Sequence, residues 1–167
     1  MRPWRPAEDL DALARLNADP DVMRWIAPHR PLTAAESAEL LDRVVRHWDE
    51  HGFGLWALVP REPGADVIGF AGLAIPSFLP AVLPTVEVGW RLAPAWWGRG
   101  LATEAARASL DHGFGRLGLR SVVSLIDERN ARSLRLARRL GMRPGKDRLH
   151  PITRRRLRVM ELGPPEG

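Results

Sequence analysis

The chain has 167 residues, 45% of them hydrophobic, and a net charge of +5. This size and composition fit one globular domain with a substantial core. Cysteine is absent, which excludes disulfides, thiolate metal sites and a cysteine nucleophile. No apolar stretch reaches the roughly 20 residues of a membrane span, and the N-terminus lacks the apolar region of a signal peptide. We therefore expect a single cytoplasmic domain over residues 1–167, with a loose tail at 163–167.

The charge is unevenly distributed along the chain. Residues 91–167 contain 17 Lys or Arg and 7 Asp or Glu, whereas residues 1–90 contain 8 and 13. A basic half suits a polyanionic ligand and an acidic half suits a cationic one. Simple solubility of an arginine-rich chain explains the same numbers equally well.

The first half predicts two helices followed by three strands. Apolar residues at helical spacing end at Pro20, and a capping box at Thr33 to Glu36 opens the second helix, which Gly52 closes. The predicted elements are helices over 6–19 and 33–52 and strands over 53–59, 67–75 and 85–92, with a hairpin turn at 63–66 and a proline-rich loop at 76–84.

The second half alternates helices and strands. Residues 121–126 are almost continuously apolar, which is typical of a strand buried on both sides. The other predicted elements are helices over 101–117 and 130–140 and a final hairpin of 142–146 with 154–162. This order predicts a central mixed sheet with helices on both faces.

The junction at residues 97–103 reads Trp-Gly-Arg-Gly-Leu-Ala-Thr. Glycines let the backbone approach a ligand closely, and the unpaired N–H groups of a helix N-terminus suit a phosphate. The junction therefore predicts a pyrophosphate cradle, with a tight strand-to-helix turn as the alternative. It is one glycine short of a dinucleotide fingerprint, and the preceding elements lack the strand–helix alternation which that fold requires.

Residues 86–143 resemble the GCN5-related N-acetyltransferases (GNAT). Their signature Gln/Arg-x-x-Gly-x-Gly/Ala corresponds to residues 97–102, with Trp97 where Gln or Arg is usual. The run Trp-Trp-Gly-x-Gly-x-Ala-Thr-Glu-Ala is similar to the RimJ/RimL-type branch, which acetylates ribosomal-protein N-termini. Further similarities to that branch lie at residues 2–5, 19–23, 52–56, 130–133 and 140–142.

The resemblance implies an α/β (α+β) fold of the GNAT type. Its sheet is mixed, mostly antiparallel and twisted, with about six to seven strands, helices on both faces and a splayed strand pair at the cofactor site. The implied enzyme is an N-acetyltransferase that moves an acetyl group from acetyl-CoA to a primary amine, either a protein N-terminus or a small amine. Direct attack without an acyl-enzyme needs no metal, because positioning and removal of solvent supply most of the acceleration.

The resemblance also assigns coenzyme contacts. Pantetheine pairs with the splayed strand edge as an added strand, and the glycine turn takes the pyrophosphate. The implied cofactor-binding residues are Trp90, Leu92, Trp97, Gly98, Arg99, Gly100, Leu101, Ala102, Thr103, Asn130 and Ser133. Asn130 is also a good helix N-cap, which is a structural alternative to coenzyme contact.

Two residues are candidates for catalysis. Ser133 would protonate the leaving thiolate, since the chain has no tyrosine, which many relatives use; a serine is a poor acid, so water shares this role. Glu87 lies on the opposite strand face from Val86 and Val88 and would accept the ammonium proton if burial raises the pKa of its carboxyl.

The implied acceptor site is walled by residues 25–29 and by the loop at 76–84. Trp25, His29 and Phe78 are the predicted substrate contacts, with core packing as the alternative for Trp25. We expect a basic coenzyme side and an acidic acceptor side, which favours an amine substrate. Several members of this family pair through sheet edges or C-terminal strands, so the resemblance also raises a homodimer as an assembly to test.

Other functions fit less well. Residues 47–51 match the zinc-hydrolase pattern His-x-x-Glu-His, but Gly52 ends the helix and no third ligand is evident. Nucleic-acid binding is disfavoured because no aromatic residues interleave the arginines at 129–139 and 154–158. Two rivals remain: a coenzyme-A-binding module or sensor without turnover, and a basic protein that contacts RNA or the ribosome.

Overall fold

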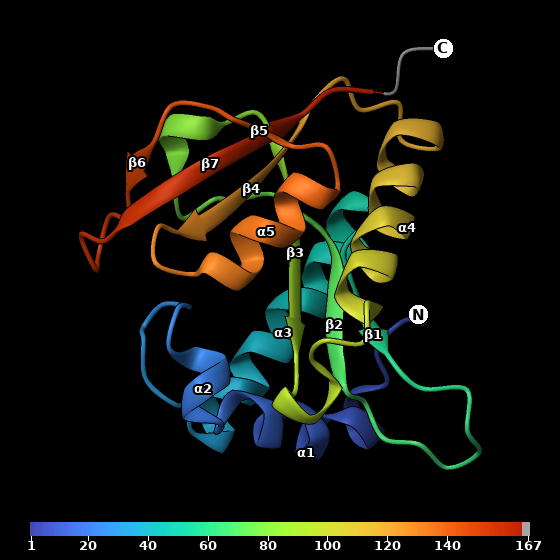
Figure 1. Cartoon of the computed structure of the whole chain (residues 1–167). Helices are drawn as coiled ribbons and strands as arrows, with labels where there is room; N and C mark the ends of the chain where they lie inside the picture. The colour runs from blue at the N-terminus through green and yellow to red at the C-terminus, as the bar shows by residue number, and fades with distance from the viewer. Residues whose placement is uncertain (165–167) are drawn as a thin grey trace.

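The computed structural model describes residues 1–164, in which seven strands form one sheet. The strand order is β1-β2-β3-β4-β7-β5, and β6 pairs with the opposite end of β7 from β5 (Figure 1). The strands are β1 (Leu55–Leu58), β2 (Gly69–Ala74), β3 (Val86–Leu92), β4 (Val122–Asp127), β5 (Arg143–Pro144), β6 (Arg148–Leu149) and β7 (Arg156–Leu162). The helices are α1 (Pro6–Asn17), α2 (Pro20–Met23), α3 (Ala34–His51), α4 (Leu101–Gly115) and α5 (Ala131–Arg139), with 3-10 turns at Pro80–Val82 and Pro94–Trp96.

Helices cover both faces of the sheet. Helices α1 and α3 pack on one face around Leu13, Leu41 and Phe70. Helices α4 and α5 pack on the other around Val88 and Leu110. Figure 1 shows α5 in front of β3, α4 to the right of it along β2, and α3 behind the sheet. The predicted fold class is therefore confirmed.

Local signals placed most helix ends correctly. Both reciprocal hydrogen bonds of the capping box at Thr33 are present, and Gly52 ends α3 in the left-handed conformation. Pro20 follows the end of α1, as predicted, but it also begins α2, where the Asp19 side chain accepts from the N–H groups of Asp21 and Val22. The sequence prediction missed α2 because four residues show no helical period.

The final hairpin was predicted too simply. Strand β5 pairs with β7 as expected. The connecting segment contributes β6, which pairs with the other end of β7, where Arg148 lies opposite Leu157. A two-residue strand carries no alternation to detect. The predicted tail at 163–167 lies largely outside the described residues.

Within residues 1–164 a single strand pair, β3 with β4, is parallel, and it separates almost at once. The two strands pair at Val86–Val122 and Glu87–Val123, although β3 continues to Leu92. Strand β3 pairs with β2 from Glu87 to Leu92, and β4 pairs with β7 along its whole length. Each strand thus follows a different neighbour, and the β4-facing edge of β3 is unpaired beyond Glu87. This is the predicted splayed pair.

Over residues 1–164, none of the helices is long and apolar enough to span a membrane.

Candidate functional site

The turn between β3 and α4 depends on its two glycines. Gly98 and Gly100 have φ of 77° and 81°, and Gly100 is the N-cap of α4. The N–H groups of Thr103 and Glu104 donate to the Gly100 carbonyl at 2.9 and 3.0 Å. A Cβ on either glycine would meet no atom within 4 Å, so these residues are required by the backbone conformation and not by packing.

Main-chain donors are left free at this turn. Within the described chain, the N–H groups of residues 98–102 donate no hydrogen bond. They coincide with the positive end of the α4 dipole, an arrangement that favours a bound anion. The geometry fits the predicted pyrophosphate cradle.

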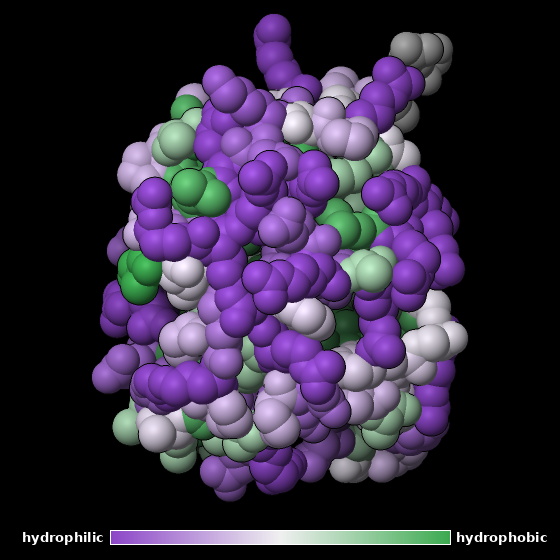
Figure 2. All heavy atoms as spheres, turned by 60° about the vertical axis from the view of Figure 1, so that its left-hand side comes forward, coloured by the Kyte–Doolittle hydropathy of each residue, from purple (hydrophilic) through white to green (hydrophobic). Residues whose placement is uncertain are grey.

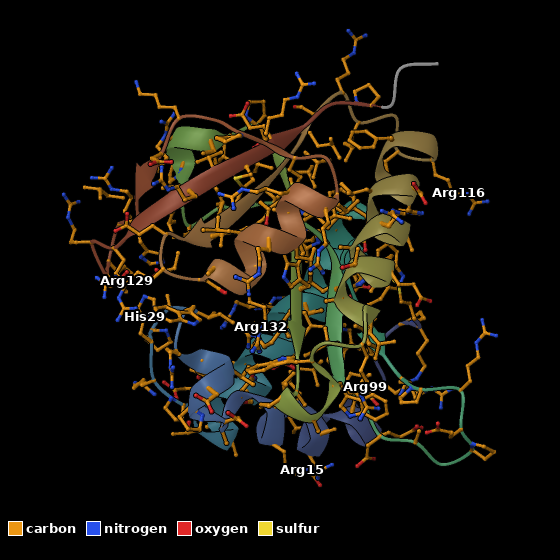
Figure 3. The ribbon with its side chains drawn as sticks, viewed as in Figure 1. Arg15, His29, Arg99, Arg116, Arg129 and Arg132 are labelled. Atoms are coloured by element: carbon orange, nitrogen blue, oxygen red, sulfur yellow. The ribbon has the colours of Figure 1, made fainter. Side chains whose placement is uncertain are left out.

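Two arginines stack on the tryptophans of this turn. The guanidinium carbon of Arg132 lies 4.1 Å from the Trp97 ring centroid, and that of Arg99 lies 4.8 Å from the Trp96 centroid. Trp97 is itself held by a 2.7 Å hydrogen bond from Nε1 to the Leu92 carbonyl. Figure 3 shows Arg132 pointing from α5 toward the turn. We call the opening between β3 and β4, beyond their last pair at Glu87 and Val123, the splay. Positive charge therefore lies on both sides of the splay.

A second contact crosses the splay from β3 to α5. Trp90 Nε1 donates to Ser133 Oγ at 3.4 Å, so the structure brings these two predicted site residues together. Asn130 Oδ1 accepts from the Ser133 N–H at 3.1 Å, which makes Asn130 the N-cap of α5. The structural alternative for Asn130 is thus present, and Ser133 is fixed at the first turn of α5.

Glu87 lies where β3 and β4 separate. Val86 and Val88 are buried in the α4 side of the core, so the alternation of the strand directs Glu87 to the other face. Its Oε1 accepts from the Leu125 N–H at 3.3 Å, a β4 donor that β3 no longer pairs. Burial raises the pKa of Glu87 from 4.5 to about 7, against a smaller opposing effect of this hydrogen bond.

Two of the predicted acceptor residues, Phe78 and His29, lie near His150 in the loop between β6 and β7. Phe78 is exposed and stacks on His150, with ring centroids 5.3 Å apart. His29 contributes to lowering the pKa of His150, although burial is the larger cause. His29 and Phe78 therefore share a neighbour from the β6–β7 loop. Trp25 is half-buried and belongs to none of the core clusters, so the alternative of core packing does not hold for it.

An arginine from the β6–β7 loop contacts both the end of β4 and the segment that follows α2. Arg155 Nη1 lies 3.4 Å from the buried carboxylate of Asp127, at the end of β4, and 3.4 Å from the carbonyl of Arg24, after α2. In Figure 3, His29 and Arg129 project to this same side of the molecule. The surrounding surface carries mainly hydrophilic side chains, with apolar ones in small separate groups (Figure 2).

The zinc alternative is inconsistent with the bonding of His47. Its Nδ1 lies 2.8 Å from the Phe53 carbonyl, and its Nε2 accepts from the Ile75 N–H at 3.0 Å. Both ring nitrogens are therefore used to hold α3 on the sheet. Among residues 1–164, no group of three His, Cys, Asp or Glu side chains is placed to bind a metal. The mostly antiparallel sheet likewise excludes the dinucleotide fold.

Two surface hollows lie outside the splay. One, of about 500 Å³, follows α4 from Gly100 to Asp111 and includes the charged side chains of Glu104 and Arg107. The other, of about 410 Å³, lies between the end of α1 and the β1–β2 loop and includes Arg15, Asp66 and Trp96.

Two arginines of the site are not among the predicted site residues. Arg132 belongs to the arginine-rich run at 129–139, and nothing in the local sequence indicates that it stacks on Trp97. Arg91, on β3, is partly buried between Phe70 and Asn17. A signal for Arg91 did exist, because it falls on the same strand parity as Glu87.

Comparison with known proteins gives one consistent result. Residues 1–143 match the family described as acetyltransferase (GNAT) domain. A Bordetella pertussis protein assigned to the GnaT-family acetyltransferases is 31% identical, with a TM-score of 0.79 over 96% of this chain and 92% of that chain. Spermidine N(1)-acetyltransferase of Escherichia coli K12 is 27% identical over 86% of this chain and 72% of its own.

A third protein shares the fold. YncA of Salmonella typhimurium, an acetyltransferase by assignment, was solved with its cofactor acetyl-CoA and is 22% identical. Its TM-score is 0.73, over 99% of this chain and 94% of that chain.

Proposed function

Because the chain belongs to the acetyltransferase (GNAT) domain family, we propose that it moves the acetyl group of acetyl-CoA to a primary amine by direct attack. Acetyl-CoA is the acetyl donor of this family, and its thioester supplies the activated acyl carbon. The observation that carries the proposal is the row of free main-chain donors at residues 98–102, beside the unpaired edge of β3. We assign the whole of residues 1–167 to this one domain.

The coenzyme residues divide into three groups. The free amides of residues 98–102, together with Arg99 and Arg132, hold the pyrophosphate. The predicted Thr103 amide is not part of this set, because it already donates to the Gly100 carbonyl. The free edge of β3 at Trp90 and Leu92 holds the pantetheine arm as an added strand would. Ser133 and Asn130, on α5, close the other side of the splay.

Proton transfer divides between the two sides of the splay. The amine nitrogen attacks the thioester carbon, the C–S bond breaks, and the thiolate leaves. Glu87 accepts the proton of the amine, directly or through a water molecule; a pKa of about 7 suits a base that must be ionised and still bind a proton. Ser133, sharing the role with water, returns a proton to the thiolate sulfur.

The acceptor is a primary amine, either on a small molecule or at a protein N-terminus. The similarity to the RimJ/RimL-type branch supports an N-terminus, and the spermidine acetyltransferase among the relatives supports a small amine. We assign Trp25, His29 and Phe78 to the walls that contact it.

The test is thiol release from acetyl-CoA in the presence of peptides, polyamines and other small amines. We expect amine-dependent release by the wild type and a rise in thermal midpoint on adding CoA. Binding of CoA without transfer to any amine would support the coenzyme-binding module instead. Salt-dependent retention on RNA, with no thermal shift from CoA, would support the RNA-contacting protein.

A further inference from the structure

Three residues of β3 alternate along the face that looks toward α1 and α3. They are Glu87, Gly89 and Arg91, and they follow the point at which β3 and β4 separate. The proposed mechanism uses only Glu87. Gly89 and Arg91 indicate which kind of acceptor molecule can bind next to that carboxylate.

Arg91 is a cation with an incomplete set of partners. Its Nη1 donates to Asn17 Oδ1, and its guanidinium carbon lies 4.9 Å from the Phe70 ring centroid. Its Nε is buried and has no partner, and within residues 1–164 its Nη2 donates no hydrogen bond and no carboxylate pairs with the side chain. Asn17 is fully buried and its side-chain amide donates to Ser37 Oγ, so the oxygen that accepts from Nη1 is held in place.

The free donors of Arg91 form a specific pattern. With Nη1 occupied, Nε and Nη2 present two parallel N–H groups on one edge of the guanidinium. That edge matches the two oxygens of a carboxylate. A buried donor without a partner is destabilising, so a ligand that completes the partners of the guanidinium gains affinity. Nε is fully buried, whereas Nη2 is not, so Nη2 is the donor that a carboxylate reaches.

The strand face between Arg91 and Glu87 carries no side chain, because the residue there is Gly89. A Cβ built on Gly89 would meet no atom within 4 Å, so the strand face is open there. Gly89 is two residues from each neighbour, about 6.6 Å along the strand. An amine above Gly89 can therefore approach Glu87 while a group a few bonds away reaches Arg91.

The charges of the strands that form the splay do not suit a polycation. The carboxyl groups of β3 and β4 are those of Glu87 and Asp127, and Asp127 accepts from the Arg129 N–H and from Arg155. The acidic residues that give residues 1–90 their negative charge include the exposed Glu39, Asp42, Asp49 and Glu50 on α3. The expected acidic acceptor side is thus not found on β3 and β4.

We infer, on the basis of the proposed function, that the acceptor is an amine carrying a carboxylate a few bonds away, an amino-acid-like compound whose carboxylate Arg91 binds. This inference selects among the small amines of the proposed function and disfavours spermidine and other polyamines.

The first test uses the wild-type protein alone. Thiol release from acetyl-CoA is measured with common amino acids, each paired with its amide, and with spermidine. We expect kcat/KM for the best amino acid to exceed that of its amide by about ten- to hundredfold, mainly through KM. Turnover of amides or spermidine as efficient as that of amino acids overturns the inference and leaves the proposed function intact. No transfer to these compounds or to the peptides of the assay described under the proposed function, with CoA still bound, overturns both.

The second test compares Arg91→Gln with Arg15→Gln, a matched control whose arginine pairs with Asp66 on the outer side of α1. Arg91→Gln should raise KM for the amino acid to the level of its amide and leave kcat/KM for the amide unchanged. Arg15→Gln should change neither. The thermal shift with CoA checks that both variants fold. An Arg91→Gln enzyme that retains the preference for the carboxylate, or that loses both acceptors equally, contradicts the assignment of Arg91.

Discussion

The two faces of β3 are built for different purposes. Val86, Val88 and Leu92 are buried against α4 and α5, whereas the opposite face carries Glu87 and Arg91 around the open position at Gly89. The apolar face stabilises the strand by burying side chains, at about 25 cal/mol per Å² of apolar surface. On the other face, burial displaces the pKa of both ionisable groups, that of Glu87 to about 7 and that of Arg91 to about 10.

This contrast shows that one face of β3 stabilises the fold, whereas the other holds buried ionisable groups that destabilise it and are available for chemistry. Neither ionisable group is paired with an opposite charge within residues 1–164, so each pays the cost of leaving water without full compensation. The apolar face keeps β3 in register with β2 despite that cost. The following predictions perturb one side of the strand or the turn that continues it, from the largest expected effect to the smallest.

Gly100→Glu should lower the affinity for acetyl-CoA by at least about a hundredfold. The substitution places a side chain at φ 81° and a negative charge among the donors of the cradle. Calorimetric titration with CoA measures the effect. Gly64→Glu is the matched control, because Gly64 has φ 75° and equally open space but lies in the β1–β2 loop. Equal affinity of wild type and Gly100→Glu would falsify the cradle.

Glu87→Gln should lower kcat/KM by about a hundredfold or more, the usual contribution of a general base. Wild-type kcat/KM should rise as pH increases through about 7, because the ionised carboxylate is the active form. The Gln variant should lose that rise, since its amide does not titrate. A pH–rate profile with the same inflection in both proteins assigns the base to another group.

The same variant should be more stable than the wild type at alkaline pH. The folded-state pKa of Glu87, about 7, lies above its ordinary value of 4.5, so between these values the folded state binds more protons. The free energy of unfolding therefore falls as pH rises from about 4.5 to 7. Above pH 7, the free energy of unfolding of Glu87→Gln should exceed that of the wild type by at most about 3 kcal/mol. Denaturant unfolding at pH 5 and 8 measures this, and a constant difference between the two pH values contradicts it.

Ser133→Ala should lower kcat by about tenfold while KM for acetyl-CoA stays nearly unchanged. The variant removes the hydroxyl that accepts from Trp90 and leaves the backbone N–H that Asn130 caps. Ser133→Thr should restore most of the rate. Steady-state kinetics separates the two parameters, and a rise in KM alone would show that Ser133 only positions the coenzyme.

Arg132→Ala should weaken CoA binding by about fivefold through loss of the stack on Trp97, an interaction of about 1 kcal/mol. Arg135→Ala, at an exposed position of the same helix, is the control for net charge. If both variants weaken binding equally, the effect of Arg132 is long-range charge and not the contact with Trp97.

The sequence by itself determined the features that depend on near neighbours. The capping box, Gly52, the positive-φ glycines at 98 and 100 and the alternation around Glu87 are all set by residues within one turn or strand. Their chemistry could be predicted because helix ends and strand faces impose it locally.

Only the tertiary structure decided which distant groups meet. The separation of β3 from β4, the stack of Arg132 on Trp97 and the incomplete shell of Arg91 each join segments that are far apart in the chain. An exposed arginine and one that bridges two elements have the same local sequence pattern. What distinguishes them is the packing of the sheet, since burial decides which charged groups keep water as a partner and which must find another.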